Sequence, residues 1–268
     1  MATDLDGTFW DRSVQAHPRS LAAVAELQRR GVLVVAATGR RPRSARTALQ
    51  ENGLTVPAVC LDGTFGEDWA TGQRFHQAFF TDEESAAILA AFVELAVAPN
   101  VFVDHPELDV LLAELPAHQP ERAEALLPWA HIGPLQHSVP LHTVAAFTVI
   151  GGAFDDLAPL ASVLRASGLA RATLTKDSLY GGTSLSVIPN AASKWAGVAA
   201  LAATLGIGPE EIVGVGDAAN DLELLAGAGV AVAVTTACDE VLAIADIIID
   251  APADGGWSAL VDICGAPT

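Results

Sequence analysis

Short apolar segments alternate with helix-like segments at both ends of the chain. A strand that is apolar at consecutive positions is buried on both faces, as in a parallel sheet covered by helices. The expected strands are Val32–Thr38, Val56–Leu61, Ile212–Gly216, Val230–Val234 and the Ile-rich run at 246–250. The expected helices are Pro18–Gly31, Arg43–Glu51, Asn220–Ala226 and Asp239–Ala245. The pattern predicts an α/β fold with a Rossmann-like, doubly wound parallel sheet.

The pattern changes between residues 81 and 186. This section has helix-like spacing at 82–96 and 157–167, strand-like segments at 101–103, 144–150 and 185–188, and Pro-rich stretches within 116–140 that we expect to be loops. We therefore predict a discontinuous core domain, residues 1–80 and 187–268, with an inserted α+β domain at 81–186.

Composition excludes several classes of function. The net charge of −18 disfavours nucleic acid and anionic membranes as partners. No apolar run reaches the roughly 20 residues of a membrane span, and no basic segment precedes an apolar one near the start. We expect a soluble, cytoplasmic protein, a monomer or a homodimer. The cysteines and histidines show no metal-ligand spacing.

The pentapeptide LDGTF occurs twice, at 5–9 and at 61–65. Asp4 precedes the first copy, whereas Cys60 precedes the second. If residues 1–6 form a strand, Asp4 and Asp6 project to the same side, and at about 4 Å they repel by about 4 kcal/mol at an effective dielectric constant of about 20. They then need a cation or a shared proton. The second copy, with Asp62 alone, is interpreted as a turn, and the repeat as a coincidence.

Three further polar stretches follow expected strands or begin expected helices. They are Thr38-Gly39-Arg40, Lys194, and the segment from Gly216 to Asp221. Because ligands of open α/β sheets bind at the carboxyl ends of the strands, all three can meet Asp4 and Asp6 in one crevice. Lys194 is one of only two lysines beside twelve arginines, and a compact ammonium suits a buried site between carboxylates and a phosphoryl group.

With these motifs in order, the sequence resembles the haloacid dehalogenase-like superfamily, in particular its Cof-type phosphatases with a type IIB cap. The resemblance rests on DLDGT, ATGRRP, LDGTFGEDWATGQ, LSVIPNAASK, GVGDAANDLELL and AGVAVAV, and covers nearly the whole chain. Proteins of this kind are mostly Mg²⁺-dependent hydrolases of small phosphorylated metabolites such as sugar phosphates. The inserted domain would be the cap that selects the substrate.

The resemblance assigns a role to each site residue. Asp4 would attack phosphorus and become an aspartyl phosphate, and Asp6 would protonate the leaving alcohol and later activate water. Mg²⁺ would be held by Asp4, the backbone carbonyl of Asp6, Asp217 and, as a further ligand, Asp221. The phosphoryl group would be bound by Thr38, Gly39, Asn220, Lys194 and Arg40. A phosphomutase with the same Asp4 chemistry and a non-catalytic phosphometabolite-binding protein are the alternatives.

Some positions depart from the family pattern. Asp62 stands where family members usually have Asn, Trp195 replaces a frequent Gly, and Thr235-Thr236 replaces a frequent Gly-Asn. Only three residues precede Asp4, whereas a central strand usually has about 4 to 8, so either the strand is short or the native chain extends upstream. Hinges are expected at 62–66 and 181–188. The cap residues that are candidates to face the substrate, although such residues more often lie on the surface, are His105, Arg122, Lys176 and Tyr180.

Overall fold

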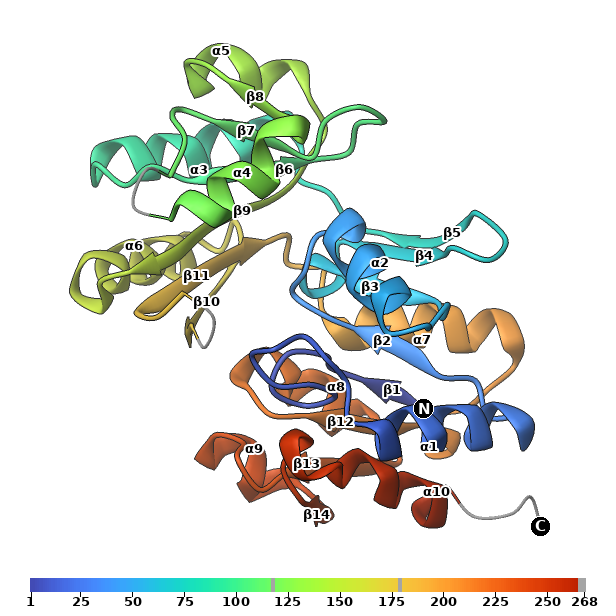
Figure 1. The fold of residues 1–268 in the computed structure, drawn as a ribbon. Helices are drawn as coiled ribbons and strands as arrows, with labels where there is room; N and C mark the ends of the chain where they lie inside the picture. The colour runs from blue at the N-terminus through green and yellow to red at the C-terminus, as the bar shows by residue number, and fades with distance from the viewer. Residues whose placement is uncertain (117–118, 178–179, 265–268) are drawn as a thin grey trace. The chain divides into compact units, whose positions relative to one another are not determined.

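The computed structural model describes residues 1–116, 119–177 and 180–264 (Figure 1). The chain forms two compact units. The first contains residues 1–77 and the chain from Ser193 on, and the second contains Ala78–Ala192. In the described ranges, no helix has the length and apolar character needed to cross a lipid bilayer.

An eight-stranded sheet forms the centre of the first unit. Its strands, in spatial order, are β14 (Ile247–Ile249), β13 (Val230–Val234), β12 (Val213–Gly216), β1 (Ala2–Thr3), β2 (Val35–Ala37), β3 (Ala58–Cys60), β4 (Phe65–Asp68) and β5 (Gln73–Gln77). The six strands from β14 to β3 are parallel, and β4 and β5 add an antiparallel hairpin at one edge. The predicted parallel-sheet α/β fold is confirmed.

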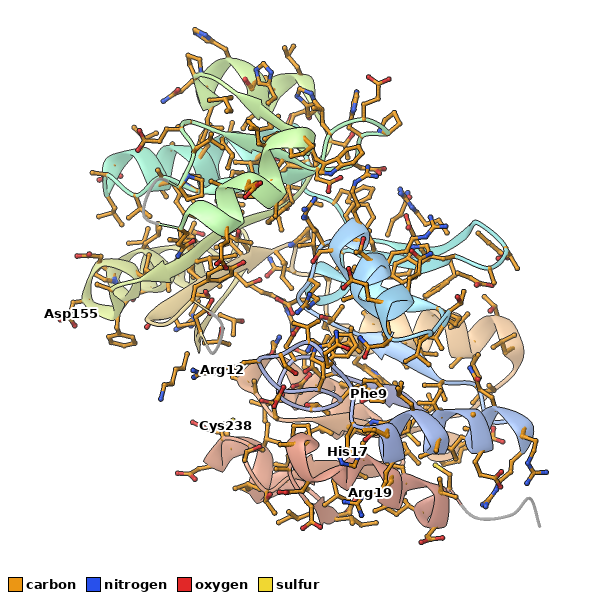
Figure 2. The ribbon with its side chains drawn as sticks, viewed as in Figure 1. Phe9, Arg12, His17, Arg19, Asp155 and Cys238 are labelled. Atoms are coloured by element: carbon orange, nitrogen blue, oxygen red, sulfur yellow. The ribbon has the colours of Figure 1, made fainter. Side chains whose placement is uncertain are left out.

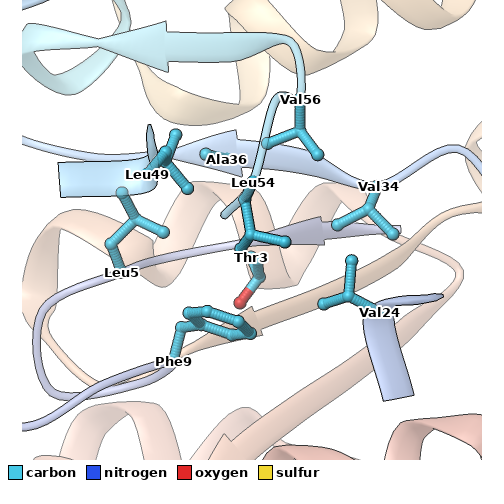
Figure 3. A pocket seen from close by; sticks show the side chains of 9 residues that line it. All are labelled: Thr3, Leu5, Phe9, Val24, Val34, Ala36, Leu49, Leu54 and Val56. Carbon is cyan, nitrogen blue, oxygen red and sulfur yellow. The ribbon is translucent and has the colours of Figure 1, made fainter. Parts of the chain in front are cut away.

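Helices cover both faces of this sheet (Figure 1). On one face, side chains of α7 (Lys194–Leu205) and α8 (Leu222–Gly227) pack against Ala2, Val35 and Val59. On the other face, α1 (Pro18–Arg29) and α2 (Pro42–Glu51) contribute Val24 and Leu49 to a small apolar pocket that Thr3 and Ala36 also line (Figure 3). Successive residues of β1 and β2 therefore point to opposite faces, as burial on both sides requires.

The order of the strands places a topological switch point beside β1. The chain runs from β1 to β2 and β3 on one side, and β12, β13 and β14 continue on the other side. In open α/β sheets, ligands bind at the carboxyl ends of the strands where the order reverses. The residues that follow β1 and β12 are therefore at the position where this fold builds a site.

The loop that follows β1 is tightly packed. Leu5 and Phe9 line the apolar pocket with side chains of β1, β2, α1 and α2 (Figure 3). Phe9 also makes edge-to-face contacts with Trp10 and with Trp257 of the C-terminal segment, and Figure 2 shows it inside the first unit. At about 10 Å³ the pocket is near the smallest volume that holds one water, and its walls are mostly apolar. It therefore serves packing.

The second unit is an α+β structure built on a six-stranded sheet. Its strands, in spatial order, are β10 (Arg171–Lys176), β11 (Thr183–Ile188), β9 (Val144–Gly152), β6 (Asn100–Val103), β7 (Val110–Leu112) and β8 (Ala130–Ile132). Helices α3 (Asp82–Glu94) and α6 (Phe154–Ser167) share one apolar core with the sheet, in which Phe147 contacts Phe80 and Phe92. The shorter helices are α4 (Pro120–Leu126) and α5 (Leu135–Ser138).

The expectation that the Pro-rich section would be loops was wrong. The Pro-rich section within 116–140 contains α4, α5 and β8. Pro120 stands in the first turn of α4, where the missing N–H carries no cost, and Pro134 is the N-cap residue of α5. The expected hinge segments, 62–66 and 181–188, each lie inside one unit, and the units divide at 77/78 and 192/193. Hairpin pairing of β4 with β3 and β5 holds the first segment in the large sheet.

Candidate active site

A buried lysine joins two carboxylates from distant parts of the chain. Lys194 begins α7, after Ser193 accepts a hydrogen bond from the Ala196 amide and caps the helix. Its Nζ donates to Asp4 Oδ1 and to Asp221 Oδ1, both at 2.6 Å. The exposed fractions of Lys194, Asp4 and Asp221 are 1%, 5% and 0%. Such burial of three charged groups is rare unless they are paired, as they are here.

Asp221 is held from two directions. Its Oδ1 accepts from Lys194, and its Oδ2 accepts from the backbone amides of Asp217 and Ala218, each at 3.0 Å. A Cβ on Gly216 would lie 2.4 Å from the Asp221 Cβ, which explains the glycine at the end of β12. Asp221 thus fixes the turn that follows β12 as well as the lysine.

Asp217 occupies the switch point opposite Asp4. Its Oδ1 accepts from the Thr8 hydroxyl at 2.7 Å, which ties the loop after β12 to the loop after β1. Gly7 has a φ of 96°, and a Cβ there would lie 2.5 Å from Asp217 Oδ2. The glycine of D-x-D-G-T therefore supplies both a left-handed backbone and the space for Asp217.

Three of the carboxylates can share one cation. Asp4, Asp217 and Asp221 each offer an oxygen, and these oxygens lie within 4.8 Å of one another. Carboxylate oxygens are the ligands that Mg²⁺ selects, so the donor set fits such an ion. Both oxygens of Asp221 already accept from Lys194 and the backbone, which leaves Asp4 and Asp217 as the better placed ligands.

The electrostatics of the cluster favour an added cation. Burial raises the pKa of Asp4 well above its usual range, against the opposing effect of Lys194. Burial and the neighbouring Asp221 raise the pKa of Asp217 to about 6. Burial lowers the pKa of Lys194, but Asp221 and Asp4 outweigh this and hold the pKa above its ordinary value. The ammonium stays charged, and the cluster remains short of positive charge.

The side chain of Asp6 has different hydrogen-bond partners from the side chain of Asp4. Arg40 donates from Nε to Asp6 Oδ2 at 2.6 Å and from Nη2 to Oδ1 at 2.5 Å, and the Trp10 indole N–H donates to Oδ1 at 2.9 Å. The expected strand over residues 1–6 was wrong, because β1 ends at Thr3 and both Asp4 and Asp6 lie beyond it. Arg40, which was expected to bind the phosphoryl group, forms an ion pair with Asp6.

The remaining predicted residues lie around Asp62. Thr38 is buried, and its carbonyl accepts from the Asp62 amide at 3.1 Å. A Cβ on Gly39 would lie 3.1 Å from Asp62 Oδ1, and Asn220 donates to that same oxygen at 2.9 Å. Asp62 was expected only as part of a hinge. The sequence carried one signal at this position, because Asp62 stands where family members usually have Asn.

The two LDGTF copies have different backbones. Leu61 and Asp62 adopt positive φ angles of 46° and 52° in a 3₁₀ turn, Leu61–Gly63, while Leu5 and Asp6 do not. Identical side chains are therefore presented in different directions. The first copy follows Asp4 directly after β1, whereas the second copy follows Cys60 at the end of β3.

Comparison with known proteins shows the family of the chain. The haloacid dehalogenase-like hydrolase family matches residues 1–111 and 169–259. The chain belongs to this family. The family and the hydrolase class predicted from the sequence are confirmed.

Individual relatives are distant. The phosphoglycolate phosphatase of Methanopyrus kandleri is 24% identical over 93% of this chain and 89% of its own length. The chloroplastic endoribonuclease YBEY of Arabidopsis thaliana is 26% identical over 91% of this chain, which spans only 43% of that protein. The solved structure of the subclass IIB sugar phosphatase BT4131 superposes with a TM-score of 0.79 at 18% identity, covering 99% of this chain and 98% of its own. The last likeness concerns the fold alone.

Replacing Lys194 with Met should lower the free energy of unfolding at pH 8 by about 3 to 5 kcal/mol, because two buried carboxylates lose their cation. Carboxylates with a raised folded-state pKa bind more protons when folded, so the deficit should shrink as the pH falls from 8 towards 5. Urea unfolding at both pH values measures this. The exposed Lys176→Met is the control, and a deficit independent of pH would contradict the interpretation.

Replacing Asp217 with Asn should stabilise the metal-free protein at pH 8 by roughly 1 to 3 kcal/mol, because the folded state then lacks a carboxylate whose pKa is raised to about 6. Below the unfolded pKa of about 3.9 both states are protonated and the gain should vanish. Urea unfolding with a chelator tests this, with the exposed Asp250→Asn as control. Equal or lower stability at pH 8 would refute it.

Proposed function

We propose that this protein is a Mg²⁺-dependent phosphatase that hydrolyses a small phosphorylated metabolite through an aspartyl phosphate on Asp4. The observation that carries the proposal is the buried contact of Lys194 with Asp4 and Asp221, beside Asp217 at the switch point. A buried carboxylate held by an ammonium suits attack on phosphorus, where charge must be offset. Family membership and the phosphatases among its relatives add support.

In the first step, an Asp4 oxygen attacks phosphorus and the ester P–O bond breaks with its electron pair on the leaving oxygen. Lys194 holds the nucleophile and offsets negative charge that develops next to it. Thr38, the Gly39 amide and Asn220 bind phosphoryl oxygens. Asp4, the backbone carbonyl of Asp6 and Asp217 would hold Mg²⁺, which when bound offsets the charge of the phosphoryl oxygens.

Asp6 moves the protons in both steps. It gives a proton to the leaving oxygen as the ester bond breaks, and it takes one from the water that attacks the aspartyl phosphate. The water oxygen binds phosphorus, and the Asp4 carboxylate is regenerated with the electron pair of the broken bond. Arg40 and Trp10 donate hydrogen bonds to the Asp6 carboxylate.

The second unit, residues 78–192, is proposed to be the cap that selects the metabolite. It has its own sheet and core, so it can move as a body about the connections at 77/78 and 192/193. A sugar phosphate or a similar phosphomonoester is the proposed substrate class.

Purified protein should release phosphate from at least one of a panel of sugar phosphates, phosphoglycolate, nucleotides and cofactor phosphates, with release dependent on Mg²⁺. Asp4→Asn should lower kcat/KM at least about 10³-fold, which is about 4 kcal/mol of barrier. The exposed Asp11→Asn, in the segment that follows the same loop, is the control. Comparable turnover by Asp4→Asn would refute Asp4 as nucleophile, and retention of label within a sugar bisphosphate would indicate a phosphomutase instead.

Replacing Asp62 with Asn should strengthen inhibition by inorganic phosphate by about three- to tenfold, or about 0.7 to 1.4 kcal/mol. The substitution removes a buried negative charge from the neighbourhood of Thr38, Gly39 and Asn220 but keeps an oxygen that accepts from Asn220. Competitive inhibition constants measure the change. Glu51→Gln, exposed in α2, should leave the constant unchanged, and weaker inhibition of Asp62→Asn would contradict the assignment.

A further inference from the structure

Trp10 is fully buried in the loop that carries the two N-terminal aspartates. Its exposed fraction is 0%, and its amide donates to the Leu5 carbonyl at 3.1 Å while its carbonyl accepts from the Gly7 amide at 2.8 Å. These bonds close residues 5–10 into a compact loop around Asp6. The position of the indole relative to Asp6 is therefore set by the backbone of a single short segment.

The indole N–H of Trp10 forms a hydrogen bond with the Asp6 carboxylate. Trp10 Nε1 donates to Asp6 Oδ1, and Arg40 donates to both Asp6 oxygens. The Arg40 guanidinium carbon also lies over the Trp10 ring, 5.6 Å from its centroid, within the range of a cation–π contact. Trp10 thus contacts both members of the Asp6–Arg40 ion pair.

We propose that Trp10 is a positioning residue that fixes the orientation of the Asp6 carboxylate for proton transfer. The inference rests on the proposed phosphatase function, in which Asp6 is the acid and then the base. The torsion that rotates an aspartate carboxylate has a broad energy minimum, so the side chain needs outside donors to hold one orientation. The Asp6 side chain is 38% exposed, and packing alone does not hold it.

The hydrogen bonds also distinguish the two carboxylate oxygens. Oδ1 accepts from Trp10 and from Arg40, which engages both of its lone pairs, whereas among the described residues Oδ2 accepts from Arg40 alone. The open acceptor position is therefore on Oδ2. With Trp10 in place, Oδ2 is the oxygen that gives the proton to the leaving oxygen and takes the proton from water.

A purely structural role for Trp10 predicts a different outcome. Loss of packing slows the hydrolysis of every substrate by a similar factor. Loss of acid positioning affects chiefly substrates whose leaving oxygen needs a proton. An alkyl phosphomonoester releases a basic alkoxide unless it is protonated, while an aryl phosphate releases a stabilised phenolate.

The test compares kcat/KM for p-nitrophenyl phosphate and for an alkyl phosphomonoester from the panel that the wild type hydrolyses. In Trp10→Phe the value for the alkyl ester should fall by roughly tenfold to a hundredfold, and the value for the aryl ester by at least several-fold less. Trp257→Phe is the matched control, because Trp257 is also fully buried, contacts Phe9 and donates its indole N–H, there to Thr3. Its two substrates should change by one common factor.

Equal losses for both substrates in Trp10→Phe would overturn the inference. Should this variant fail to fold, 3-benzothienylalanine at position 10 replaces the N–H with sulfur in a ring of the same shape, and the same preferential loss is expected. In an Asp6→Asn background, the Trp10 change should lower aryl hydrolysis no further, since coupled residues are not additive. A wild type that hydrolyses neither p-nitrophenyl phosphate nor any member of the panel would instead refute the proposed function.

Discussion

The arrangement of the site depends on burial of the Lys194 ammonium between Asp4 and Asp221. Taking charged groups out of water costs several kcal/mol per ion, and the cost is offset only when the partners are in direct contact and the remaining lone pairs are satisfied. The structure meets this condition, because Asp221 also accepts from two backbone amides. These bonds force β1, the start of α7 and the turn after β12 together, so the switch point cannot open without exposing unpaired charge.

The strand order of the large sheet brings the carboxylate partners of Lys194 together. A parallel order with β1 between β12 and β2 brings the loops after these strands to one edge of the sheet, although Thr8 and Asp217, which form a hydrogen bond there, are 209 positions apart. Glycines then allow the close approaches: Gly7 leaves room for Asp217, and Gly216 leaves room for Asp221. In the motifs D-x-D-G-T and G-D, the glycines are thus needed for close packing and the aspartates for the chemistry.

The sequence was sufficient to predict the sheet and the convergence of Asp4, Lys194, Asp217 and Asp221, because both follow from the apolar strands and from where polar residues stand at their ends. It was not sufficient to predict the partners of Asp6 and Arg40. Asp6 and Arg40 lie outside the strands, so the alternation of side chains along a strand does not predict where they point. The arginine side chain also has several rotatable bonds between its backbone and its guanidinium. Trp10 gave no signal, since an apolar residue after D-G-T is expected in the core, and only its N–H distinguishes it.

The strands of the second unit were harder to predict from the sequence, again because the local pattern of residues does not determine them. Strands such as β7, β8 and β10 are short or have mixed polarity, and their pairing is set by the neighbouring strand more than by their own pattern.

The same electrostatics connect stability with function. Burial, and after it the neighbouring carboxylates, raise the pKa values of Asp4 and Asp217, which means that their ionised forms destabilise the folded state. A divalent ion that binds only the folded chain removes this cost in proportion to its affinity. Asp62 adds another buried carboxylate, which accepts a hydrogen bond from Asn220. A chain optimised for stability alone would lack this excess of negative charge, and its presence at the switch point is therefore a mark of function.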